Sequence, residues 1–130
     1  MIVLDASAAV ALALGLEGSG QISDRVFDGR STLHSPHLID LEVAQSLRRY
    51  VLRGEAGPRR ARKALSDFGD LSLTRYPHDV LLPRVWQLRG NLTAYDAAYV
   101  ALAEMLSAPL LTRDARLARA GGHRANIELI

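Results

Sequence analysis

Cysteine is absent from the 130 residues of the chain. Its absence excludes a disulfide-stapled scaffold, a thiol nucleophile and every zinc site that depends on thiolate ligands. A chain without cysteine is compatible with the reducing cytosol.

Long hydrophobic runs and a basic leader are missing as well. The longest weakly polar stretch, 6–16, is far shorter than the roughly 20 apolar residues of a membrane-spanning helix. No Lys or Arg precedes the apolar residues at the start, and Asp5 follows them directly, which is not the pattern of a secretory signal. We therefore expect a cytoplasmic protein without a membrane segment.

The composition that is present is that of an ordinary globular protein. Hydrophobic residues make up 48% of the chain and charged residues 23%, which excludes disorder and low complexity. A length of 130 residues suffices for one hydrophobic core. Residues 1–130 are therefore predicted to form a single domain.

Basic residues are concentrated in one region, although the net charge is only +2. Lys63 is the only lysine, and seven of the sixteen basic residues fall between Arg48 and Lys63, where Glu55 is the only acid. The planar guanidinium group of Arg suits phosphate, so the cluster favours nucleic acid as a partner. A solvated helical face explains the cluster equally well.

Short aliphatic and β-branched runs alternate with amphipathic stretches along the whole chain. Strands are expected at 1–5, 31–34, 71–76, 110–113 and 126–130. Helices are expected at 6–16, 21–27, 36–53, 59–68, 79–88, 94–106 and 114–120. Ser35 and Pro36 have the residue types of a helix cap and a first helical position, and Thr93 that of another cap. The alternation predicts an α/β fold, a three-layer α/β/α arrangement around a mostly parallel sheet.

Four acidic residues fall where this topology can bring them together. Asp5 and Asp114 each follow a predicted strand, so both lie at the carboxyl edge of a parallel sheet, where such sheets bind ligands. Asp96 lies in the first turn of one predicted helix, and Glu42 about two turns into another. All four can face one cleft.

A divalent cation is the partner that such a cluster favours. Neighbouring carboxylates repel one another as anions and are costly to desolvate, and a bound cation relieves both effects. Because the available ligands are oxygens, the pattern favours Mg²⁺, with Mn²⁺ as a substitute, over zinc.

Each Asp also has a structural alternative. Asp5 and Asp114 have the position of caps on the helices that follow them, and Thr93 with Asp96 has the spacing of a capping box. For any one of these Asp residues alone, the cap is the favoured interpretation. Glu42 lacks this explanation, because at about 100° per residue it falls between apolar positions of its helix.

The helix that carries Glu42 continues with polar residues on the same side. Ser46, Arg49 and Arg53 follow at i+4, i+7 and i+11. We interpret Arg49 and Arg53 as contacts for the phosphates of a bound polyanion, with ordinary surface Arg as the alternative for Arg53.

Other titratable residues receive structural explanations. Asp40 is the rival acid on the helix of Glu42, but the positive end of the helix dipole accounts for it. Four histidines occur singly in turn-like contexts, without metal-ligand spacing, and are expected at the surface: His34, His37, His78 and His123.

Taken together, these residues resemble the PIN-domain ribonucleases and, among them, the VapC toxins of bacterial toxin–antitoxin pairs. The matching fragments span the chain and are, in order, 2–8 (IVLDASA), 36–48 around LEV at 41–43, 92–99 (LTAYDAAY) with 101–103, and 111–117 (LTRDARL). The resemblance implies an acidic site made of Asp5, Glu42, Asp96 and Asp114. It implies that Asp5 and Asp96 bind Mg²⁺ directly and that Thr112 supplies a supporting hydroxyl.

The same resemblance implies a fold, an activity and partners. The fold is a five-stranded parallel sheet between helices, and the activity is Mg²⁺-dependent endoribonuclease cleavage of RNA by a toxin. Asp114 would serve a second ion or its waters, and Glu42 would orient or deprotonate the attacking water. The partners are a VapB-like antitoxin, whose C-terminal segment lies over the active-site groove, and a second copy in a homodimer.

Two other functions compete with this interpretation. Aspartyl-phosphate enzymes use the carboxylate after the first strand as a nucleophile. Their sequences have the pattern Asp-x-Asp at that point, whereas this chain has Asp5-Ala6-Ser7. A non-catalytic RNA-binding or protein-interaction module, in which the acids are structural caps, is the second alternative. Metal titration separates it from the nuclease, since clustered carboxylates respond to Mg²⁺ and caps do not.

Overall fold

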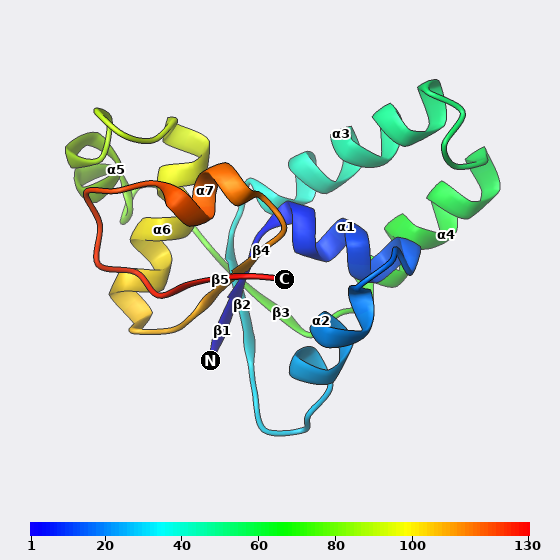
Figure 1. Ribbon diagram of the computed structural model, residues 1–130, viewed down its shortest axis with the longest axis horizontal. Coiled ribbons are helices and arrows are strands. Elements are labelled where there is room, and N and C mark those ends of the chain that lie inside the picture. The colour runs from blue at the N-terminus through cyan, green and yellow to red at the C-terminus, as the bar shows by residue number, and fades with distance from the viewer.

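The computed structural model describes all residues, 1–130, and contains five strands and seven helices in alternation (Figure 1). The strands are β1 (Ile2–Leu4), β2 (Leu33–Pro36), β3 (Leu73–Tyr76), β4 (Leu110–Thr112) and β5 (Ile127–Leu129). The helices are α1 (Ala6–Leu14), α2 (Ser19–Val26), α3 (Ile39–Leu52), α4 (Pro58–Gly69), α5 (Leu82–Gln87), α6 (Ala94–Leu106) and α7 (Ala115–Arg119). None of the helices combines the length and the apolar character needed to cross a bilayer.

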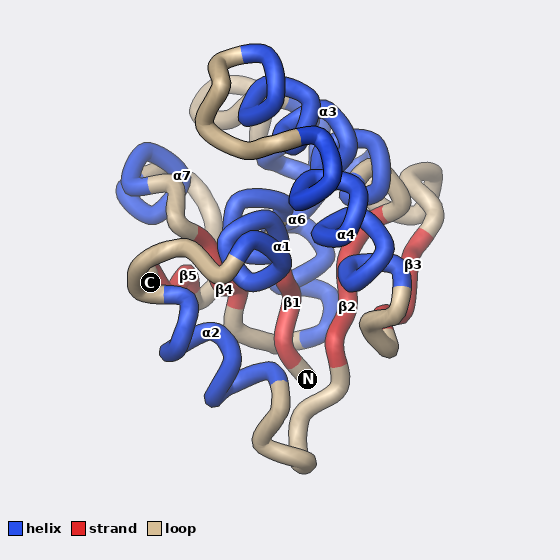
Figure 2. The backbone as a smooth tube through the Cα atoms, turned by 90° about the vertical axis from the view of Figure 1, so that its right-hand side faces the viewer, coloured by secondary structure: helices blue, strands red, loops and turns tan.

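The strands form one parallel sheet in the order β3-β2-β1-β4-β5, which Figure 2 shows from right to left. The first strand is therefore central, with β2 on one side and β4 on the other. Val3 is paired with His34 of β2 and with Leu110 of β4. All five strands end at the same edge of the sheet, so the residues that follow them are neighbours in space.

Helices cover both faces of the sheet, as the prediction of a three-layer α/β/α fold requires. α1 contacts α2, α3 and α4 on one face, whereas α6 packs on the other face against β1 and β2 and carries α5 (Figures 1 and 2). α7 packs against β4 and β5. The predicted fold class and the five-stranded sheet are confirmed.

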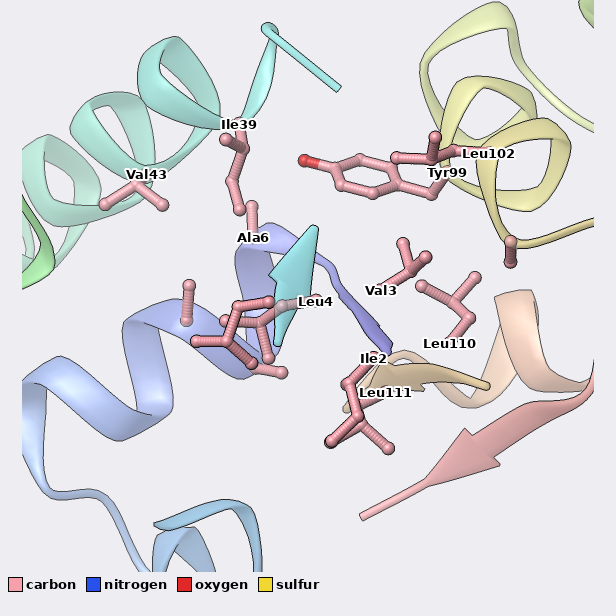
Figure 3. Close-up of a cluster of buried hydrophobic side chains, with 14 of the residues drawn as sticks. Ile2, Val3, Leu4, Ala6, Ile39, Val43, Tyr99, Leu102, Leu110 and Leu111 are labelled. Carbon is pink, nitrogen blue, oxygen red and sulfur yellow. The ribbon is translucent and has the colours of Figure 1, made fainter. Parts of the chain in front are cut away.

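The core is built from the central strand β1 and the two most apolar helices, α1 and α6. Val3 and Leu4 are completely buried, and so are Ala8, Ala9 and Ala11 of α1, whose small side chains let this helix approach the sheet closely. Figure 3 shows β1 between the aliphatic side chains of α3 and β4, with the ring of Tyr99 inside the same cluster.

The predicted start of the third helix is wrong. Ser35 and Pro36 belong to β2, where Pro36 is paired with Tyr76, and α3 begins only at Ile39. The hydroxyl of Ser35 is buried and donates to the carbonyl of Leu4 at 2.6 Å, so it ties two strands together instead of capping a helix. As a consequence, Glu42 lies in the first turn of α3 and not two turns into it.

Three of the four histidines predicted to be ordinary surface residues have structural contacts. The ring of His123 lies after α7, with its Nε2 atom 2.8 Å from the carbonyl of Ala120 and its Nδ1 atom accepting a hydrogen bond of 3.1 Å from the amide of Ala125. His34 is buried in β2, with its ring nitrogens 2.7 Å from the hydroxyls of Thr32 and Tyr76. The Nε2 atom of His78 accepts a hydrogen bond of 2.9 Å from the amide of Leu38 at the start of α3. The contexts looked turn-like in the sequence because short strands and loops share their residue types.

Asp40 also has a partner that the sequence did not indicate. Both of its carboxylate oxygens accept hydrogen bonds from Arg75 of β3, at 2.8–2.9 Å. The ion pair joins α3 to the edge strand β3. It gives Asp40 a structural role that Glu42 does not share.

The buried position of β4 predicts a large effect of truncating one of its side chains. Leu111→Ala removes a fully buried side chain that is paired with Leu4, and we expect it to lower the free energy of unfolding by about 2–5 kcal/mol. Leu129→Ala on the edge strand β5 is the matched control, because Leu129 is 53% exposed and should cost less than about 1 kcal/mol. Urea unfolding measures both, and equal losses would contradict the assignment of β4 to the core.

Candidate active site

A cavity of about 550 Å³ opens at the carboxyl edge of the sheet. Its wall includes the four carboxylates predicted from the sequence, Asp5, Glu42, Asp96 and Asp114. They belong to four different segments: in the order given, the residue after β1, the first turn of α3, the first turn of α6 and the turn after β4. Side chains up to 109 positions apart in the sequence therefore face one cavity.

Asp5 lines the cavity and caps a helix at the same time. Its Oδ1 atom accepts hydrogen bonds from the amide of Ala8 at 2.9 Å and from the hydroxyl of Ser7 at 2.7 Å. Its Oδ2 atom accepts a hydrogen bond of 2.5 Å from Thr112. Burial nevertheless raises the pKa of Asp5 to about 6, because the loss of water outweighs these three hydrogen bonds.

Thr112 connects the two Asp residues that follow strands. Its hydroxyl is completely buried, donates to Asp5 and accepts a hydrogen bond of 3.0 Å from the amide of Asp114. Asp114 in turn caps α7, where its Oδ1 atom accepts from the amides of Arg116 and Leu117. Partial burial raises the pKa of Asp114, but the hydrogen bonds outweigh it, so the pKa lies below the usual value.

Glu42 and Asp96 are half-buried, and both are less acidic than usual. Burial is the main cause of the raised pKa of Asp96, and the nearby charge of Asp114 adds to it. Burial also raises the pKa of Glu42, and the charge of Asp96 contributes in the same direction. Thr93 caps α6 by accepting from the amide of Asp96 at 3.2 Å, as predicted, so the backbone of Asp96 satisfies the cap and its carboxylate is left for the cavity.

The donor atoms in this cavity are carboxylate oxygens, and burial disfavours the anionic forms of Asp5, Glu42 and Asp96. A hard divalent cation would relieve that cost. No group of three or more His, Asp and Glu side chains is arranged to enclose one metal ion. The residues present thus fit a cation held by one or two carboxylates and water, the coordination that Mg²⁺ prefers.

The two arginines predicted to contact RNA differ in their position. Arg49 and Ser46 line the cavity on the side of α3. Arg53 lies one helical turn further, as the residue that ends α3, and it is not part of the wall. A guanidinium group that was not predicted, that of Arg116, lines the cavity on the side of α7 at 3.4 Å from Asp114.

Two further residues of the site were not singled out from the sequence. Ser7 accepts a hydrogen bond of 2.9 Å from the amide of Arg113 while it donates to Asp5, so it joins the turns after β1 and β4. Tyr99 donates a hydrogen bond of 2.6 Å to the Oε1 atom of Glu42. The available signal was helical spacing, since Tyr99 lies three residues after Asp96 and therefore on the same face of α6.

The raised pKa of Asp5 predicts how its replacement affects stability in metal-free protein. A carboxyl group that titrates at about 6 in the folded state and at 3.8 when unfolded stabilises the fold below that interval, and the stabilisation is lost as the pH rises through it, by up to about 3 kcal/mol. Asp5→Asn removes the charge and keeps an oxygen for the cap. We expect the variant to be more stable than the wild type at pH 7 and not at pH 4.

Urea unfolding in chelator across this pH range measures the difference. Asp24→Asn, at an exposed position of α2, is the control for the loss of a surface charge. A stability difference between Asp5→Asn and the wild type that does not change with pH would contradict the assigned shift.

Known proteins resemble the chain over its whole length. The PIN domain model matches residues 2–123. Ribonuclease VapC9 of Mycobacterium tuberculosis is 45% identical over 130 residues, which cover 100% of this chain and 98% of that protein. Ribonuclease VapC1 of the same organism is 47% identical over 129 residues, with 98% and 96% covered.

Solved structures agree with this relationship. The crystal structure of PAE2754 from Pyrobaculum aerophilum superimposes with a TM-score of 0.70 at 25% identity and covers 97% of this chain and 81% of its own. VapC20 of Mycobacterium tuberculosis, described as a toxin that cleaves the sarcin-ricin loop, shares the fold with a TM-score of 0.64 at 13% identity, covering 91% and 93%. The chain belongs to the PIN domain family, and within it to the VapC-type ribonucleases.

Proposed function

We propose that this chain is an endoribonuclease that hydrolyses phosphodiester bonds of RNA and acts as the toxin of a toxin–antitoxin pair, with residues 1–130 as one catalytic domain. The observation that carries the proposal is the shared cavity of Asp5, Glu42, Asp96 and Asp114 at the carboxyl edge of a PIN-type sheet. The full-length relatives that are named VapC ribonucleases support the same activity.

Ribonucleases of this family generally depend on a divalent metal ion, and we propose Mg²⁺, with Mn²⁺ as a substitute. Asp5 and Asp96 would bind it directly, and Asp114 would bind a second ion or its waters. Such an ion supplies positive charge for the non-bridging phosphate oxygens and makes a bound water more acidic. Two direct carboxylates completed by water are consistent with the absence of a closed group of three ligands.

The residues of the chain divide the remaining tasks. Glu42 orients the attacking water and accepts its proton, for which its raised pKa makes it a better base than an ordinary carboxylate. Thr112 fixes the orientation of Asp5 through its hydrogen bond to Oδ2. Arg49 binds a phosphate beside the cavity, and Arg53 binds the strand one helical turn further.

We propose two protein partners, each for a different surface of the molecule. A VapB-like antitoxin would inhibit the enzyme by laying a segment over the open cavity, and the reaction would take place in the cytoplasm, where the RNA is. For the homodimer, exposed apolar side chains on α5 and at the start of α6 offer a surface to a second copy: Leu82, Trp86 and Tyr95.

One observation favours a non-catalytic alternative, a binding module with structural acids. Asp5 and Asp114 do cap α1 and α7, which is what that alternative requires. Capping and metal binding are not exclusive, however, because the cap occupies Oδ1 of each residue, whereas Oδ2 accepts one hydrogen bond and keeps a second lone pair. The two functions therefore differ in their response to metal and in cleavage, not in the hydrogen bonds.

Asp96→Asn separates the two functions, because the Asp96 side chain caps no helix. In Mg²⁺, we expect the wild type to cut total RNA and the variant to be at least ~100-fold slower, because it loses a direct ligand of the ion that would stabilise the developing charge and make the attacking water more acidic. Mapping of the cut ends with and without chelator measures cleavage. Mg²⁺ should raise the melting temperature of the wild type by mass action and that of the variant much less.

The matched control is Asp24→Asn on α2, which should cleave RNA and respond to Mg²⁺ like the wild type. RNA that stays intact with the wild type in both Mg²⁺ and Mn²⁺, or an unchanged rate for Asp96→Asn, would favour the binding module.

Arg49→Ala tests the phosphate contact. The substitution should weaken RNA binding for all sequences and reduce the magnitude of the slope of log K against log salt by about 0.7–1, the effect of losing one phosphate contact. Arg53→Ala should have a smaller effect, because Arg53 lies outside the cavity wall. Arg30→Ala, in the exposed loop before β2, is the control, and an Arg49→Ala slope equal to that of Arg30→Ala would contradict the contact.

A further inference from the structure

The core of the protein contains one tyrosine whose hydroxyl reaches the candidate active site. Tyr99 is 2% exposed, and its ring packs with the aliphatic side chains around β1. Figure 3 shows the ring beside Leu102, with its oxygen directed away from α6 and towards Ile39 at the start of α3. This oxygen donates to Oε1 of Glu42 at 2.6 Å, across the gap between α6 and α3.

The hydrogen bond leaves the two oxygens of Glu42 in different environments. Tyr99 is the only side chain that donates to Glu42, and it engages Oε1. No buried side-chain oxygen in the protein lacks a partner, so Oε2, which has none, is accessible to solvent. Since Glu42 lines the cavity, one oxygen is held by the core and the other is free to meet water there.

The hydroxyl of Tyr99 is a permanent donor. Burial raises the pKa of Tyr99 above its usual value of 10, and the charge of Glu42 raises it further. The phenol therefore keeps its proton at neutral pH. In return, the hydrogen bond lowers the pKa of Glu42 against the larger effect of its burial.

We propose that Tyr99 is a positioning residue of the nuclease: its hydroxyl fixes Oε1 of Glu42 and thereby presents Oε2 to the attacking water. The inference rests on the proposed function of Glu42. A purely structural role is the competing explanation, since a buried tyrosine hydroxyl needs some partner. The two explanations differ in what Tyr99→Phe does, because phenylalanine keeps the ring in the core and removes only the donor.

Kinetics of RNA cleavage test the positioning role. Tyr99→Phe should lower kcat about 10-fold or more, because general-base catalysis contributes about 10²–10⁴-fold, while KM for RNA and the Mg²⁺-induced rise in melting temperature stay within about twofold of the wild type. Tyr50→Phe is the matched control, since Tyr50 is a half-buried tyrosine of α3 that lies outside the cavity wall. It should cleave like the wild type.

Unfolding of the metal-free protein gives a second readout, independent of activity. Tyr99→Phe should lower the urea midpoint when Glu42 is present. In the Glu42→Ala background the same substitution should lower the midpoint much less or leave it unchanged, because there the hydroxyl has lost the carboxylate to which it donates.

The outcomes are distinct. A wild-type kcat for Tyr99→Phe, or a loss that appears in KM and in the Mg²⁺ response to the same extent, would overturn the positioning role. Equal loss of stability in both backgrounds would overturn the coupling of Tyr99 to Glu42. If the wild type itself fails to cleave RNA in Mg²⁺ and Mn²⁺, the proposed function fails, and the unfolding measurements still report on the hydrogen bond.

Discussion

The concentration of negative charge at one edge of the sheet is the constraint on which the rest of the structure depends. Four carboxylates share one cavity, and for Asp5, Glu42 and Asp96 burial raises the pKa. The fold tolerates this cost because hydrogen bonds from helix amides and from Thr112 offset part of it. A site that is unfavourable for its own anions is suited to bind a cation, and the free energy lost in folding is recovered on binding.

Two side chains that cap helices are also the ones proposed to take part in the chemistry. From the sequence, Asp5 and Asp114 could be interpreted either as helix caps or as members of an acidic site. The structure shows both as caps and places both in the cavity wall. A carboxylate fixed by backbone amides has a defined orientation, and that is what a metal ligand requires. The cap is therefore the means by which the strand–helix turn aims the side chain.

Much of the fold followed from hydrophobic periodicity. The boundaries of α6 were predicted at the residues where the structure has them, because Thr93 is a clear cap and the helix is apolar on most of its surface. The start of α3 was predicted wrongly, because Ser35 and Pro36 are as suitable at the end of a strand as at the start of a helix. Only the hydrogen bond from the Ser35 hydroxyl to the carbonyl of Leu4 distinguishes the strand from the helix. Local pattern cannot report such a contact.

Some residues of the candidate site were predicted from the sequence and others were not. Residues that follow strands were found, because a parallel sheet brings strand ends together. Tyr99 and Arg116 were not, because their roles depend on which helix face meets the cavity. Arg53 was predicted to line the site because helical spacing places it on the same face of α3 as Glu42. The wall of the cavity ends one helical turn earlier, at Arg49.

The pairing of β1 with β4 also sets the order in which the protein can become active during synthesis. The central strand precedes β4, its neighbour on one side, by more than a hundred residues, and Thr112 and Asp114 belong to that later segment. Until that segment emerges, Asp5 lacks the hydrogen bond from Thr112, and the wall of the cavity lacks Asp114 and Arg116. A chain that has not yet extended beyond β4 therefore lacks part of the candidate active site.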